Sequence, residues 1–185
     1  MKPTALDVLS PMTEMQVVLH EAGYSTYLSG PEEDEPTEFL MVDLEEEAGF
    51  RPWVARLLWV EDLEQALQAK AGNPPDESPP KVWHLECLLH LPLDFTDDKI
   101  PELRLLGLWL SAQLPMGVYS VDSKQGVCFR HVLLCESQRG QVLLTIDMLE
   151  RSTAGPRAHL PLFSALASGR QTLDQIRAKL SGGPK

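Results

Sequence analysis

The stretch V-W-H-L-E-C-L-L-H-L at residues 82–91 constrains the fold most, because its apolar side chains recur at every second position. Successive side chains of a β-strand point to opposite faces of its sheet. One face of such a strand holds only apolar side chains and a thiol: Trp83, Leu85, Cys87, Leu89 and Leu91. We therefore predict a strand over residues 81–91, with Cys87 directed into the core of a sheet protein.

The same stretch contains His84-x-x-Cys87-x-x-His90, a spacing that resembles a set of zinc ligands. In a strand, however, Cys87 faces away from both histidines, and His84 and His90 lie roughly 20 Å apart. A helix would bring His84 and Cys87 together, but it would scatter the apolar set and place Pro92 at its end. We therefore predict no metal and no cofactor here, and we interpret Cys87 as a buried structural cysteine.

The rest of the chain shows both helix and strand patterns. Ser10-Pro11 predicts a capped helix start, Thr172-x-x-Gln175 a capping box, and Gly126 a hairpin turn. Helices are predicted at residues 11–22, 61–70, 100–114, 141–151, 161–167 and 172–180. Strands are predicted at 24–29, 39–44, 53–60, 81–91, 118–122 and 127–134, with a helix as the alternative at 53–60.

This order of elements indicates an α+β fold with a mainly antiparallel sheet and flanking helices. In the helix at 100–114, Leu105, Leu108 and Trp109 widen the apolar face, so we expect this helix to be deeply buried. The segment A-G-N-P-P-D-E-S-P-P at residues 71–80 is expected to be a loop, because proline breaks helices and cannot donate to a sheet. The segments on either side are small for independent domains. We therefore predict one α+β domain over residues 1–185.

The Pro-rich loop separates an acidic N-terminal half from a basic C-terminal half. Residues 1–98 carry 21 acidic and 5 basic side chains, whereas residues 99–185 carry 6 acidic and 11 basic ones. The net charge of −11 repels phosphates, so we expect no nucleic acid partner. No segment has the apolar length of a signal peptide or a membrane span, and three cysteines cannot all pair. We expect a cytoplasmic protein with reduced thiols.

Spacing alone gives little support for catalysis. On a strand, Cys128 and His131 face opposite sides, and Cys135 lies about 13 Å from His131. A nucleophile and its base must lie within hydrogen-bond reach. The sequence also lacks the G-x-S-x-G, G-x-x-x-x-G-K-[ST], G-x-G-x-x-G and H-E-x-x-H motifs. We predict no catalytic residue and no enzyme.

The stretch L-S-A-Q-L-P-M-G-V-Y-S-V-D-S-K-Q-G-V-C-F-R-H-V-L-L at residues 110–134 resembles the YbjN family of bacterial sensory transduction regulators. The shared features are a helix that ends in L-P-x-G (residues 114–117), a hairpin, and an aromatic-Arg pair, Phe129-Arg130. The preceding L-P-L-D-F and I-P-E-L segments also fit, so the similarity covers about residues 82–180. This chain carries Ser111 where the family often has Asn. The resemblance implies a type III secretion chaperone-like fold, no catalytic residues, and a homodimer that binds other proteins.

The residues and the resemblance together favour a non-enzymatic, protein-binding module that is chaperone-like or regulatory. We expect partner contacts from Trp53, Leu57 and Trp59, in the stretch W-V-A-R-L-L-W-V at residues 53–60. The acidic N-terminal half is expected to favour a basic client. Two alternatives stay open: an enzyme of unrecognised type, and a DNA-associated regulator that uses basic residues of the C-terminal helices.

Overall fold

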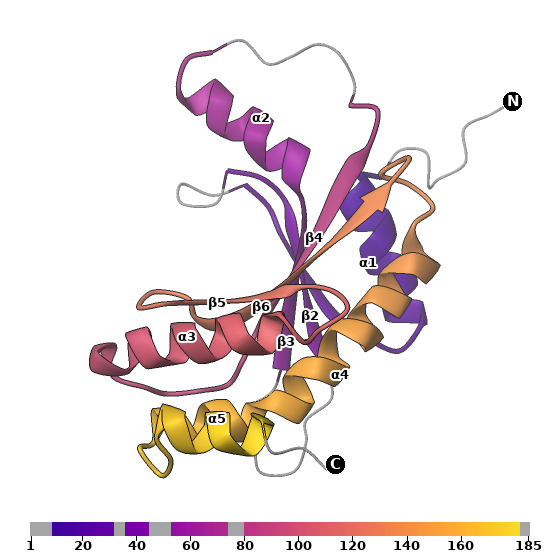
Figure 1. Cartoon of the computed structure of the whole chain (residues 1–185). Helices are drawn as coiled ribbons and strands as arrows, with labels where there is room; N and C mark the ends of the chain where they lie inside the picture. Colours follow the sequence, from indigo (N-terminus) through magenta and orange to yellow (C-terminus); the bar gives the residue numbers. More distant parts are fainter. Residues whose placement is uncertain (1–8, 32–35, 45–52, 74–79, 182–185) are drawn as a thin grey trace, which may run out of the picture.

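The computed structural model describes residues 9–31, 36–44, 53–73 and 80–181, and contains one six-stranded sheet (Figure 1). The strands are β1 (Ser25–Ser29), β2 (Phe39–Leu44), β3 (Trp53–Trp59), β4 (Trp83–His90), β5 (Val118–Asp122) and β6 (Gly126–Cys135). Their order in the sheet is β1-β2-β3-β4-β6-β5, and every neighbouring pair is antiparallel. This confirms the predicted α+β fold with its mainly antiparallel sheet, and it decides in favour of a strand at β3.

Helices α1, α3 and α4 lie on the same side of this sheet, and α5 joins their core next to α3 (Figure 1). The helices are α1 (Pro11–Glu21), α2 (Val60–Lys70), α3 (Ile100–Ser111), α4 (Val142–Ala167) and α5 (Leu173–Ser181), with a short 3-10 turn, η2 (Asp97–Lys99), before α3. Buried side chains of α1, α3, α4 and α5 form one core with the inward-facing residues of the strands. Helix α2 is the exception, because it contains no buried residue and lies at the top of Figure 1, away from the other helices.

The predicted helix starts are confirmed. The Ser10 hydroxyl accepts a hydrogen bond from the Thr13 N–H at 3.2 Å, and Pro11 occupies the first turn of α1. At α5, the Thr172 hydroxyl accepts from the Gln175 N–H, while the Gln175 side-chain oxygen accepts from the Thr172 N–H. These two reciprocal bonds form the expected capping box. The hairpin between β5 and β6 turns at Gly126, whose φ is +79°.

Two predictions about helices are wrong. Residues 141–151 and 161–167 were predicted to form separate helices, but α4 runs without interruption through Pro156 and Pro161. Its buried side chains, including Met148, Leu160 and Phe163, hold both parts against one core. Helix α3 is buried on one face only, because Leu105 and Leu108 are exposed.

Some predicted features lie outside the described residues, among them the acidic run at 32–35 and positions 74–79 of the Pro-rich loop. The last strand before this loop, β3, pairs directly with the first strand after it, β4. Their register runs from Val54↔His90 to Trp59↔Leu85. None of the helices in the described ranges combines the length and apolarity that crossing a bilayer requires.

Candidate functional site

Strand β4 places its side chains as the alternation predicted. Leu85, Cys87 and Leu89 are buried in the core, and His84 and His90 lie on the opposite face. The two histidines have different partners: His84 contacts the Glu61 carboxylate of α2, whereas His90 contacts residues of the β5–β6 hairpin. Within the described ranges, no group of three His, Cys, Asp or Glu side chains is arranged to hold a metal ion.

The three residues predicted to contact a partner lie in the core. Trp53 and Leu57 have no exposed surface, and Trp59 is 1% exposed. They occupy the inward face of β3, and Trp59 packs edge-on against Trp83 of β4 with ring centroids 6.3 Å apart. This placement does not fit a surface role, because a side chain without exposed area offers a partner nothing to contact. Their apolar character, which prompted the prediction, reflects the buried face of a central strand.

The face of the sheet opposite these tryptophans is not covered by α1, α3, α4 or α5. The strand register aligns one side chain from each strand into a row that crosses this face. We call it the transverse row, and its members in sheet order are Tyr27, Met41, Arg56, Leu88, Arg130 and Val118. Tyr27 and Val118, at its two ends, are 67% and 52% exposed.

The two cations of the transverse row already have partners. The Arg56 guanidinium lies 4.3 Å from the centroid of the Phe39 ring, and Arg130 forms an ion pair with Glu86 of the neighbouring strand. The hydrocarbon stems of both arginines add apolar surface to this face. Leu88, near the centre of the transverse row, is only 8% exposed, so the row offers its exposed apolar surface mainly at its two ends.

A thiol, a hydroxyl and an imidazole meet beneath α4, which sequence spacing did not predict. The His131 Nδ1 lies 2.8 Å from the Ser152 hydroxyl, and this hydroxyl acts to lower the pKa of the Cys87 thiol. Burial raises the pKa of Cys87 to about 12, and the nearby Glu86 carboxylate adds to this rise. Burial lowers the pKa of His131, so its ring is neutral near pH 7. The cluster therefore contains a protonated thiol that is only 1% exposed, which suits a structural network better than a nucleophile.

A second thiol–imidazole contact links β4 and β6. Cys128 Sγ lies 3.3 Å from His90 Nδ1, and the two residues are direct cross-strand partners. Burial and the Asp122 carboxylate raise the pKa of Cys128 to about 12. This thiol is also protonated at neutral pH and completely buried. Only knowledge of the β4–β6 register would have revealed this pair, because 38 positions separate the residues in the sequence.

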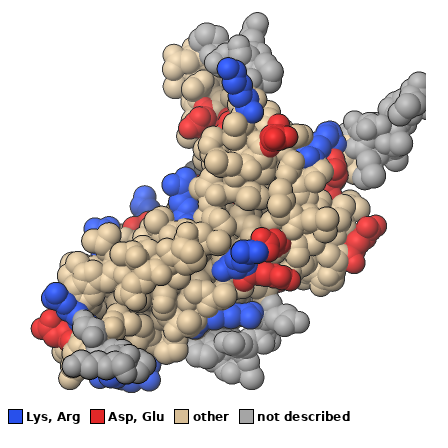
Figure 2. All heavy atoms as spheres, turned by 45° about the vertical axis from the view of Figure 1, so that its right-hand side comes forward, with Lys and Arg blue, Asp and Glu red and all other residues tan. Residues whose placement is uncertain are grey.

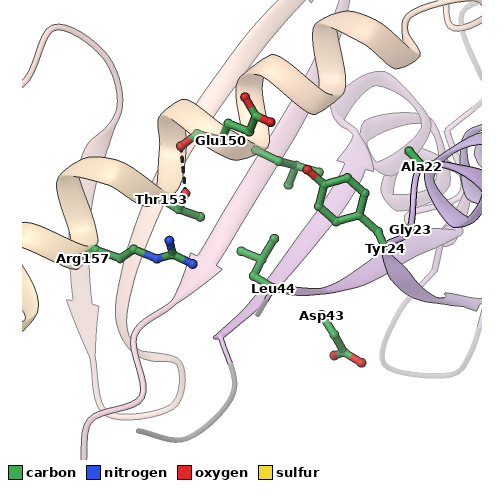
Figure 3. A pocket seen from close by; sticks show the side chains of 9 residues that line it. Ala22, Gly23, Tyr24, Asp43, Leu44, Glu150, Thr153 and Arg157 are labelled. Atoms are coloured by element: carbon green, nitrogen blue, oxygen red, sulfur yellow. Dashed lines mark hydrogen bonds between the residues drawn. The ribbon is translucent and has the colours of Figure 1, made fainter. Parts of the chain in front are cut away.

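A polar cavity of about 380 Å³ opens where the end of α1, the end of β2 and the middle of α4 meet (Figure 3). We call it the α1–α4 cavity. Its walls are residues 22–24 after α1, Asp43 and Leu44 of β2, and Leu149, Glu150, Thr153 and Arg157 of α4. The spacing of 150, 153 and 157 puts these three side chains on one face of the helix. The Nε of Arg157 is buried and has no hydrogen-bond partner.

Neither the transverse row nor the α1–α4 cavity could be predicted from local sequence. Each of them is formed by elements that lie far apart in the chain. No protein-family model and no curated protein matches this chain.

Proposed function

We propose that this chain is a protein-binding module, chaperone-like or regulatory, that acts in the cytoplasm through protein–protein contacts and not through catalysis. The observation that carries the proposal is the sheet face bearing the transverse row. Helices α1, α3 and α4 cover the other face, so this face is where the sheet presents exposed apolar side chains from its two edge strands. The proposal includes kinship with YbjN-like regulators, whose mode of action is binding to other proteins.

The occupant that fits this face is an extended polypeptide segment with apolar side chains at alternate positions. Such a segment can lie along the transverse row or extend the sheet at β1 or β5, which each have one unpaired edge in the described sheet. Covering a half-exposed apolar side chain such as Tyr27 or Val118 is worth roughly 1–2 kcal/mol. The arginines of the transverse row are already paired, so shape and apolar contact govern selection on this face more than charge.

An enzymatic function has weaker support. The described clusters that combine a thiol with an imidazole contain protonated, buried cysteines. His159 meets Tyr119 at 2.9 Å, in a group that also includes the rings of Phe129 and Phe163. Burial lowers the pKa of His159 and raises that of Tyr119, so both are neutral near pH 7. This pair is therefore better explained as a hydrogen bond within an aromatic core.

A role in DNA binding also has weaker support. On the face that Figure 2 shows, Lys and Arg side chains are interspersed with Asp and Glu over a mostly uncharged surface. Arg151 pairs with Asp147 on its own helix, and Arg139 pairs with Glu14. A surface for nucleic acid backbones requires a continuous basic stripe.

Selection of peptides from a random library displayed on phage, followed by affinity measurement, tests the proposed function. Selected peptides are expected to carry alternating apolar residues and to bind Tyr27→Asp and Val118→Asp variants at least ten-fold more weakly. The matched control is Leu143→Asp, which changes an exposed leucine near the start of α4. A library that gives no saturable binder, or binders indifferent to Tyr27 and Val118, contradicts the proposal.

We also propose that the chain forms a homodimer through α2. The apolar side chains Leu63, Ala66 and Leu67 share one face of this helix, yet none is buried, and Leu67 is 50% exposed. The first turn of α2 is acidic and its last turn is basic. An antiparallel second copy of α2 would cover the apolar stripe and bring opposite charges together at both ends.

A further inference from the structure

The α1–α4 cavity holds a guanidinium group whose hydrogen-bonding capacity is not used. Arg157 forms no hydrogen bond or ion pair with the described residues, and its Nε is withdrawn from solvent. Arg130 and Arg151 differ from it in this respect: Arg130 pairs with Glu86, and Arg151 with Asp147. A buried N–H without an acceptor loses its hydration and gains nothing in return. The terminal nitrogens of the same guanidinium also have no partner among the described residues, and they are the donors that a ligand in the cavity would use.

The cavity directs the guanidinium inward. In Figure 3 the end of Arg157 extends toward Leu44, in the middle of the lining residues, and the Asp43 carboxylate lies beyond Leu44. The neighbouring Thr153 hydroxyl donates to the Glu150 carbonyl at 2.8 Å. Its proton is therefore engaged, and Arg157 remains the main donor to an anionic group in this part of the site. The two terminal nitrogens of a guanidinium form a planar fork that matches a carboxylate.

The charges around the cavity restrict the ligand further. Asp43 and Glu150 contribute two carboxylates against the one cation of Arg157. The carboxyl end of α1, at residues 22–23, adds partial negative charge. A phosphate dianion or a nucleotide would be repelled by this lining. A ligand with one carboxylate and one ammonium group would satisfy both signs, and the Asp43 carboxylate, which accepts one bond from Ser25 at 3.1 Å, retains capacity for more.

We propose that the α1–α4 cavity binds a free amino acid or a closely similar small zwitterion. The ligand carboxylate accepts from Arg157, its ammonium group donates to Asp43, and its side chain contacts the apolar wall of Leu44 and Leu149. A cavity of about 380 Å³ is large enough for any common amino acid. Binding here joins α1, β2 and α4, so a bound ligand would stabilise the contacts between these elements.

Calorimetric titration of the full chain with each of the twenty common amino acids provides the first test. At least one is expected to bind saturably. Its amide, which lacks the carboxylate, and its deaminated acid, which lacks the ammonium, are each expected to bind at least ten-fold more weakly, as is inorganic phosphate. Absence of saturable binding for all twenty overturns the proposal. So does a phosphate affinity equal to that of the best amino acid.

Variants locate the binding. Arg157→Met keeps the hydrocarbon stem and removes the guanidinium, so it is expected to weaken binding at least ten-fold; Arg157→Lys is expected to retain part of the affinity. Arg151→Met is the matched control, because Arg151 lies on the same helix, is exposed and does not line this cavity. Equal affinity in Arg157→Met and in the unaltered chain overturns the proposal, provided that circular dichroism shows both to be folded.

Discussion

At the scale of single residues, Gly117 is the position that tolerates a side chain least. Its φ is +72°, and a Cβ added to it would lie 2.2 Å from an atom of the Phe129 ring. The positive φ alone costs an alanine about 1–2 kcal/mol. The clash with a buried ring adds roughly 1–3 kcal/mol. We therefore expect Gly117→Ala to lower the free energy of unfolding by about 2–5 kcal/mol, as measured by urea denaturation.

The control for this prediction is Gly126→Ala. Gly126 has nearly the same φ, +79°, but no atom lies within 4 Å of the position its Cβ would take. We therefore expect Gly126→Ala to be destabilised only by the positive φ, and not by a steric clash. If both variants lose the same free energy, the contact between Gly117 and Phe129 is not the reason for glycine in L-P-M-G.

The buried thiols predict how stability depends on alkaline pH. Cys87 and Cys128 have pKa values of about 12 in the folded chain, against about 8.5 for a thiol in an unfolded one. The folded state therefore holds these protons more tightly, and its stability is complete below about pH 8.5 and falls as pH rises toward 12. Between pH 8 and pH 10 we expect each thiol to contribute a loss of roughly 1–2 kcal/mol.

Urea unfolding under reducing conditions at both pH values measures this loss. A variant with Cys87→Ala and Cys128→Ala is expected to be less stable at pH 8 but to lose less free energy between pH 8 and pH 10. An equal loss in the variant and in the unaltered chain would show that other groups cause the pH dependence.

The alternation of side chains in the sequence predicted which face of the sheet a residue occupies. It did not predict which other residues that side chain contacts. It placed Cys87 in the core and His84 and His90 on the other face, because the period of a strand is a local property. The contacts of Cys128 with His90 and of His131 with Ser152 depend on strand register and helix docking. The same limit affected Trp53, Leu57 and Trp59, since an apolar run predicts burial against a partner or against the chain's own core equally well.

At the scale of elements, α4 shows packing overriding a local signal. Pro161 lies in the interior of this helix and is exposed, so its side chain contributes little to the core. It cannot donate to the carbonyl four residues earlier, that of Arg157, and its ring strains the helix. We expect Pro161→Ala to raise the free energy of unfolding by about 1–2 kcal/mol. This value allows for the greater conformational entropy of the unfolded chain when alanine replaces proline, which opposes the gain.

Thermal or urea unfolding of Pro161→Ala measures this gain, and Pro156→Ala provides the contrast. Pro156 is buried, so its replacement also removes packing contacts and is expected to give a smaller gain or a loss. A destabilised Pro161→Ala variant would mean that proline supplies a geometry that the docking of α4 requires.

The proline signal explains why sequence analysis predicted two helices where the structure has one. Proline biases the preceding residue away from helical angles, but buried side chains on both sides of Pro156 and Pro161 hold α4 to a single core. By contrast, helix ends whose signals are satisfied locally, at Ser10 and Thr172, were predicted correctly. For α3, hydrophobicity on all sides predicted deep burial, yet Leu105 and Leu108 remain exposed.

At the scale of the whole molecule, β4 joins the two halves of the sequence. It pairs with β3 from the acidic half and with β6 from the basic half, and both sets of inward side chains enter one core. Sequence patterns predicted the antiparallel class but not the position of β4 between β3 and β6, because strand order is decided by contacts between distant segments. That order is what aligns the transverse row across six strands.

The unpartnered stripe of α2 leads to a prediction about the assembled molecule. A short amphipathic helix gains most of its stability from covering its apolar face, and the described chain leaves that of α2 uncovered. Light scattering at micromolar concentration is therefore expected to give about twice the chain mass of 20.6 kDa.

Leu67→Glu would place a charge in the dimer interface and is expected to return the mass to that of one chain. Leu143→Glu, on α4, alters a leucine that is also exposed and should leave the dimer intact. A single-chain mass for the unaltered protein contradicts the homodimer, whereas dissociation by both substitutions contradicts its placement on α2.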